Sequence, residues 1–277
     1  MGVLLGIAAG VLLGVSDFMA NRASRTISSA SVSRTNLFVS GLIAPLLLFV
    51  KPVEWRLSDV VIATLSGITL SGGLMMLYRG YTVARMGVVA PTASVLLAAV
   101  PVLWDLIQGH TPSTLAASGM GLGLVALVLT TYERGGMGSV KIGILLGVGA
   151  GLLFGIAFTL TAETSEAAGL SPVLIQRVSG LLFLIALRPF VDKAPILALG
   201  VPARKWAIGS GLAGGIALGS LKLGYIKGSA GPVSVAASQF AAVAVLLSVM
   251  FNKERLRTWQ AIGVGASGVG VALMALG

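Results

Sequence analysis

The chain contains two copies of one segment, and this duplication constrains the fold more than any other feature. Residues 63–129 align without a gap on residues 207–273, and 19 of the 67 aligned pairs are identical. A second alignment, at an offset of 141 residues, superimposes four evenly spaced glycines of each half. Self-similarity of this length indicates a duplicated structural unit. We therefore expect two related halves, residues 1–131 and 142–277, joined by a linker at 132–141.

The composition predicts that both halves lie in a membrane. Hydrophobic residues make up 56% of the chain and charged residues only 10%, with a mean hydropathy of +0.98. Soluble globular domains carry about 25% charged residues. Ten apolar runs are long enough for transmembrane helices, and none shows the alternation of a transmembrane β-strand. These runs are 2–21, 31–50, 58–81, 87–108, 113–131, 142–162, 171–190, 206–226, 231–251 and 258–276.

An odd number of crossings in each half predicts that the second half is inverted relative to the first. The expected fold is an all-α membrane protein, with ten transmembrane helices arranged as two inverted five-helix repeats around a central cavity. Arg34, Arg79, Arg177 and Lys222 are set aside as candidates for membrane depth, and 12 of the other 15 basic residues lie in loops on one side. Because basic loops face the cytoplasm, both termini are expected outside.

Two predicted helices, the first and the sixth, carry a glycine at every fourth position. Without side chains on such a stripe, another helix can approach closely, and tight packing holds membrane helices together. We expect helix-packing faces at Gly6, Gly10, Gly14, Gly147, Gly151 and Gly155.

No motif of an enzyme, a nucleotide site or a metal centre is present in the sequence. The chain has no cysteine and a single histidine, which excludes cysteine catalysis, disulfides and a conventional zinc site. The net charge of +10 is scattered singly between apolar runs, and this pattern fits loops at lipid headgroups better than a nucleic-acid surface. We therefore expect no catalytic residue, cofactor, metal or nucleic-acid partner, and a multi-pass location in the plasma (inner) membrane, with the lipid bilayer as surroundings.

Charged side chains at membrane depth are candidates for a binding site, because they are costly unless they face a partner or a wet cavity. Asp17 fits a site for a substrate amine or a coupled proton, or an ion pair with Arg22 or another arginine. Arg34 and Arg177 occupy matching places in the two halves. Either could meet a substrate carboxylate through its bidentate fork, or extend to lipid headgroups.

Polar residues paired by the repeat form a second set of candidates. Tyr78 aligns with Lys222 and Tyr81 with Tyr225, so each pair is expected at symmetric positions about the cavity. The alternative is an aromatic and basic belt at the membrane interface. The remaining candidates for substrate binding are Arg79, Ser94, Trp104, Gln108, Ser238 and Gln239.

Several motifs resemble those of the EamA-type transporters of the drug/metabolite transporter superfamily. They are the Gly-Val-Ser-Asp-Phe of residues 14–18, an arginine opening the second and seventh runs, and the tyrosine–glycine–proline passages of residues 78–91 and 224–232. The resemblance covers the whole chain, although Asp17 stands where the family more often has asparagine. It implies a carrier for small metabolites, with amino-acid exporters among its bacterial members.

The function expected from these features is that of a secondary transporter. It would export small polar metabolites, amino acids or related compounds above all, by alternating access of the two inverted halves. Two alternatives remain open, a passive channel or facilitator and a structural membrane subunit that transports nothing. The choice between a monomer and a homodimer also remains open.

Overall fold

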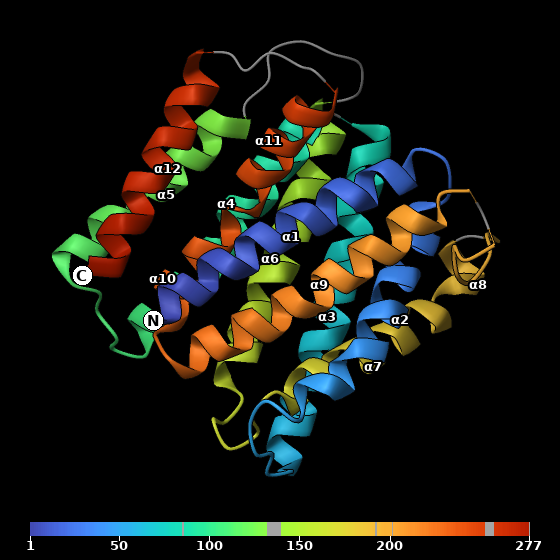
Figure 1. The fold of residues 1–277 in the computed structure, drawn as a ribbon, viewed down its shortest axis with the longest axis horizontal. Coiled ribbons are helices and arrows are strands. Elements are labelled where there is room, and N and C mark those ends of the chain that lie inside the picture. The colour runs from blue at the N-terminus through green and yellow to red at the C-terminus, as the bar shows by residue number, and fades with distance from the viewer. Residues whose placement is uncertain (85, 132–139, 192, 201, 253–257, 277) are drawn as a thin grey trace.

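The computed structural model shows an all-helical protein (Figure 1). It describes residues 1–84, 86–131, 140–191, 193–200, 202–252 and 258–276. Helices account for 82% of the structure, and no strand occurs in these ranges. Most of the linker predicted at residues 132–141 lies outside the described residues.

The described helices follow the apolar runs of the sequence. The first half holds α1 (Gly2–Ser24), α2 (Ser29–Leu47), α3 (Leu57–Val83), α4 (Met86–Ile107) and α5 (Thr114–Thr131). The second half holds α6 (Val140–Glu163), α7 (Ser171–Ala186), α8 (Arg188–Val191), α9 (Arg204–Ile226), α10 (Ala230–Ser238), α11 (Phe240–Asn252) and α12 (Thr258–Leu276).

Two apolar runs that the sequence predicts as single helices are each divided in two. The seventh run breaks between α7 and α8, where Pro189 follows within two residues and cannot donate to the preceding turn. The ninth run breaks at Gln239, whose backbone N–H donates to Ala236 three residues back rather than four. Its side-chain amide donates to the Gly123 carbonyl of α5 at 3.4 Å, a contact outside its own helix.

Four helices, α1, α3, α6 and α9, are long and apolar enough to cross a membrane by length and composition. Five further apolar helices are shorter, among them α7 and parts of α4, α5 and α12. Several apolar helices of this kind are compatible with a membrane protein. The full set of ten crossings stays a prediction.

Helices from the two halves interleave in the packing. α1 packs along α9 and against α10 and α11, and α2 also packs on α9. α6 packs between α3 and α4, and α3 also contacts α7. We call the first set the α1–α9 group (α1, α2, α9, α10, α11) and the second the α3–α6 group (α3, α4, α6, α7). α5 and α12 form a separate pair at one edge of the molecule (Figure 1).

Glycines lie where helix backbones meet within each group. A Cβ atom added to Gly6 of α1 would lie 2.7 Å from the carbonyl oxygen of Val233 on α10. One added to Gly151 of α6 would lie 2.6 Å from the carbonyl oxygen of Ala93 on α4. Such distances are too short for a side chain, so these helices contact backbone to backbone. The other glycines of the two stripes, each with an atom of α10, α11 or α4 within 3.0 Å of an added Cβ, are Gly10, Gly14, Gly147 and Gly155.

Candidate functional site

A cavity lies between the α1–α9 group and the α3–α6 group. Nine leucine and phenylalanine side chains form most of its wall, and they come from α1, α3, α4, α6, α9 and α11. Its polar lining residues are Ser16, Asp17, Asn36, Tyr78 and Arg177. The cavity has a volume of about 40 Å³, counted as the space that the centre of a water molecule can occupy. That is room for a few waters, so a metabolite can enter only if the walls separate.

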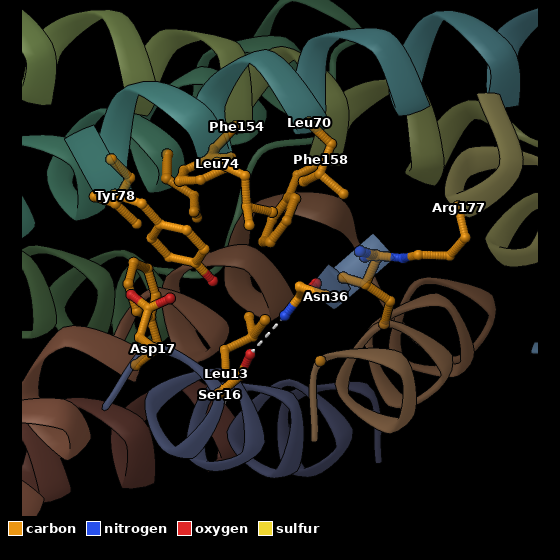
Figure 2. A pocket seen from close by; sticks show the side chains of 15 residues that line it. Leu13, Ser16, Asp17, Asn36, Leu70, Leu74, Tyr78, Phe154, Phe158 and Arg177 are labelled. Atoms are coloured by element: carbon orange, nitrogen blue, oxygen red, sulfur yellow. Dashed lines mark hydrogen bonds between the residues drawn. The ribbon is translucent and has the colours of Figure 1, made fainter. Parts of the chain in front are cut away.

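Asp17 brings a carboxylate to one end of the cavity (Figure 2). Its side chain is buried, and the hydroxyl of Tyr81 donates a hydrogen bond of 3.1 Å to its Oδ2 atom. Within the described residues, no cation lies at ion-pair distance from Asp17. The expected alternative partner, Arg22, has its guanidinium 5.3 Å from the ring centre of Phe18 and 4.9 Å from that of Trp206. A buried carboxylate without a cation is costly, so this site favours a cationic ligand or a proton.

Arg177 lies at the other end of the cavity, with its guanidinium extended toward Asn36 (Figure 2). Only 2% of the residue is exposed. In the part of the chain that the structure describes, Arg177 donates no hydrogen bond, and its Nε atom is buried without an acceptor. A buried guanidinium without an acceptor is as costly as the lone carboxylate, and its planar fork matches a carboxylate.

A polar cluster formed by Ser16, Asn36 and Ser210 joins three helices beside the cavity. The Asn36 amide donates to the hydroxyls of Ser210 at 2.7 Å and Ser16 at 3.3 Å, the second of these drawn in Figure 2. The Ser16 hydroxyl in turn lies 2.8 Å from the Ser210 carbonyl oxygen. These bonds tie α1, α2 and α9 together, so the cluster holds one wall of the cavity in place.

A second cluster, formed by Ser66, Thr161 and Gln176, does the same for the α3–α6 group. The Gln176 amide donates to the hydroxyls of Ser66 at 2.6 Å and Thr161 at 3.0 Å. The Ser66 hydroxyl also lies 2.7 Å from the carbonyl oxygen of Ala157. These bonds tie α3, α6 and α7 together.

Neither cluster was predicted from the sequence, although one signal for them was present. Ser66 and Ser210, the central residue of each cluster, are an identical pair in the alignment of residues 63–129 on 207–273. An identical polar residue at membrane depth in both copies is a reason to expect a buried partner.

Tyr78 and Tyr81 lie near Asp17, on α3. The Tyr78 side chain is 1% exposed, and its hydroxyl points into the cavity (Figure 2). The two tyrosine rings lie 6.3 Å apart between centres. Their partners in the repeat lie elsewhere: Lys222 does not line the cavity, and the Tyr225 hydroxyl is bonded to Ser234 at 2.8 Å. Of these four residues, Tyr78 alone lines the cavity, and the symmetric placement of the pairs stays a prediction.

Lys222 contacts the C-terminal end of α6. Its Nζ atom donates to the Thr164 carbonyl oxygen at 2.7 Å and lies 3.5 Å from that of Thr161. A cation is favourable there because the last carbonyls of a helix lack partners and carry partial negative charge. Since Lys222 belongs to α9, the contact links the α1–α9 group to the α3–α6 group. Next to it, Asp59 of α3 accepts hydrogen bonds of 2.7 Å from the backbone N–H and hydroxyl of Ser165.

Arg34 does not reach the cavity, although its counterpart Arg177 does. Its Nε atom donates to the Ile196 carbonyl oxygen at 2.9 Å, and Nη2 donates to that of Pro195 at 3.2 Å. Arg34 therefore anchors the segment between α8 and α9 rather than a ligand.

The remaining candidates from the sequence also lie outside the cavity. Arg79 and Gln108 are exposed, and Trp104 donates to the Glu163 carboxylate at 2.6 Å. The Ser238 hydroxyl bonds the Val235 carbonyl of its own helix. The other two are Ser94, buried without a hydrogen-bond partner among the described residues, and Gln239, at the break before α11.

Comparison with known proteins shows the fold and no more. The chain matches no protein-family model and no curated protein. A crystal structure of another protein, one of 29 matching chains, aligns with 99% of this chain and 98% of its own length. Its TM-score is 0.80 and its sequence identity 15%. The two proteins therefore share an overall fold, and at this identity the likeness carries no functional assignment.

Proposed function

We propose that the protein is a secondary transporter of the inner membrane that exports small polar metabolites, amino acids or related compounds, by alternating access. The observation that carries this proposal is the cavity between the two helix groups. Its wall is apolar except for a short polar set that includes a carboxylate and a guanidinium, each without an oppositely charged partner among the described residues. Ionisable groups inside an apolar bundle mark a ligand or ion pathway more often than a structural feature.

The pattern of helix contacts supports two inverted halves. In the alignment of the two halves, α1 corresponds to α6, α2 to α7, α3 to α9 and α4 to the α10–α11 pair. The contact of α1 with α9 then corresponds to that of α6 with α3, and the contact of α2 with α9 to that of α7 with α3. The contact of α1 with α10 and α11 corresponds to that of α6 with α4. Transporters built from inverted repeats bind their substrate where the repeats meet.

Polar contacts at opposite ends of α3 would serve as the two gates of such a transporter. At one end, Tyr81 bonds Asp17 across the two groups. At the other end, near Asp59, Lys222 bonds the end of α6. Asp59 and Tyr81 are 22 positions apart in α3, or about 33 Å at 1.5 Å per residue. The two contacts can therefore break one at a time, which alternating access requires.

Counterflow in proteoliposomes tests the proposal. Purified protein is reconstituted into vesicles loaded with an unlabelled amino-acid mixture, and the uptake of each labelled compound is followed. A carrier predicts saturable uptake that accelerates when substrate is present on the opposite face. Linear flux that does not saturate would indicate a channel, and the absence of flux for every metabolite tested would favour a structural subunit.

A further inference from the structure

The cavity presents two buried charges of opposite sign that do not pair with each other. From this we infer that its ligand is an elongated zwitterion, with an ammonium and a carboxylate group at opposite ends of an apolar spacer. The inference rests on the proposed function, because it takes this cavity as the transport site. It narrows the substrate from small polar metabolites in general to ω-amino acids and compounds of similar shape.

The two buried charges of the cavity are separated from each other. Asp17 and Arg177 are not within ion-pair distance, and Figure 2 shows them at opposite ends of the cavity. Each is at least nine-tenths buried, with 8% and 2% of the residue exposed. A ligand with one charge would neutralise one of these groups and leave the other buried and unpaired, which is unfavourable. A single ligand that satisfies both must carry both charges.

The shape of the ligand follows from what lies between the two charged groups. An α-amino acid carries its ammonium and carboxylate groups on one carbon atom, so it spans a shorter gap than a compound with these groups at its two ends. The wall between them is formed largely by apolar side chains, among them Leu13, Leu74 and Phe158. A chain of methylene groups suits such a wall, because burial of each one contributes favourably.

The polar groups near the middle of the cavity leave the spacer little to bond. The hydroxyl of Ser16 and the amide of Asn36 are already engaged with each other and with Ser210. The Tyr78 hydroxyl is directed into the cavity and can accept one bond from the ammonium group. Polar substituents on the spacer would find no hydrogen-bond partners there, so a ligand with an unsubstituted chain is preferred.

The test is a length series measured by thermal stabilisation of the full-length protein in detergent. The ligands are glycine, 4-aminobutanoate, 6-aminohexanoate and 8-aminooctanoate at equal concentrations. A compound that binds the folded state raises the apparent melting temperature, and at equal concentration the tighter ligand raises it more. We expect a maximum at one of the longer ω-amino acids. Its affinity should be at least about tenfold higher than that of pentylamine or pentanoate when these two are supplied as an equimolar mixture. One well-formed ionic contact can supply a ratio of this size.

Charge-neutralising variants locate the two ends of the ligand. In Arg177→Gln the preferred ω-amino acid should bind no better than the amine of equal length, and in Asp17→Asn no better than the carboxylate. Arg79→Gln is the matched control, because it removes one positive charge from an exposed position of α3 and should leave the length preference intact. The wild-type length series alone decides the matter if either variant fails to fold.

Two results would overturn the inference: stabilisation that is largest for α-amino acids, or stabilisation that the mixture of singly charged compounds reproduces. Both leave the proposed transport function standing if counterflow of another substrate is saturable. Conversely, a clear length optimum without any counterflow would support the ligand class and contradict transport.

Discussion

Replacement of Gly151 by alanine tests how closely α6 lies on α4. An alanine Cβ would lie 2.6 Å from the carbonyl oxygen of Ala93, 2.9 Å from the Cα of the same residue and 2.8 Å from the Cβ of Leu96. Two of these atoms belong to the backbone and the third is bonded directly to it, so no flexible side chain can move aside. One helix must therefore shift by several tenths of an ångström.

The magnitude follows from two opposing terms. Overpacking of a close contact costs about 1–3 kcal/mol, whereas alanine favours a helix over glycine by about 1 kcal/mol. Gly121→Ala on α5 is the matched control, because an added Cβ there meets no atom within 4 Å. The control variant has the favourable helix propensity of alanine without the overpacking, so the free energies of unfolding of the two variants should differ by about 1–3 kcal/mol. At about 2–4 °C per kcal/mol, Gly151→Ala should melt roughly 2–12 °C below Gly121→Ala.

The assay is the apparent melting temperature of the purified variants in detergent, measured together with counterflow. Because α6 also carries Phe154 and Phe158 of the cavity wall, a displaced α6 should reduce the rate of counterflow more in Gly151→Ala than in the control. Equal melting temperatures for the two variants would refute the backbone contact between α6 and α4.

Two further predictions concern polar contacts between helices. Lys222→Met removes the hydrogen bond from the ammonium group to the Thr164 carbonyl, so it should lower the free energy of unfolding by about 1.5–3 kcal/mol. The control is Lys227→Met, at an exposed position, which should leave the free energy of unfolding almost unchanged. Equal losses for the two variants in chemical denaturation would argue against the contact. Ser66→Ala deprives the Gln176 amide of one acceptor and should cost about 1–3 kcal/mol. The control, Thr69→Ala, removes a hydroxyl that bonds only carbonyls of its own helix, and a melting-temperature loss as large as that of Ser66→Ala would contradict the role of the cluster.

The positions of the helices could be predicted from the sequence because an apolar run is a local property. The breaks were harder to foresee. No proline or glycine marks the interruption at Gln239, and its contact with Gly123 comes from a helix more than a hundred residues away. Whether a run continues as one helix depends there on tertiary packing.

The candidate site was predictable where a residue was unusual for its surroundings. Asp17, Arg177 and Tyr78 stood out as charged or aromatic groups at membrane depth, and all three line the cavity. Arg34 and Lys222 stood out equally, but their partners are backbone carbonyls, which no pattern of side chains reveals. Symmetry of the sequence therefore identified residues of interest without determining which of each pair faces the cavity.

The most direct test of alternating access uses the absence of cysteine from the chain. A single cysteine at Leu74, which lines the cavity and is 9% exposed, is labelled with a membrane-impermeant maleimide from either face of sealed vesicles. We expect that Lys222→Met, which weakens one gate, raises labelling from one face and lowers it from the other, while Lys227→Met changes neither. Labelling that rises at one face without falling at the other, or that is absent from both, would contradict alternating access.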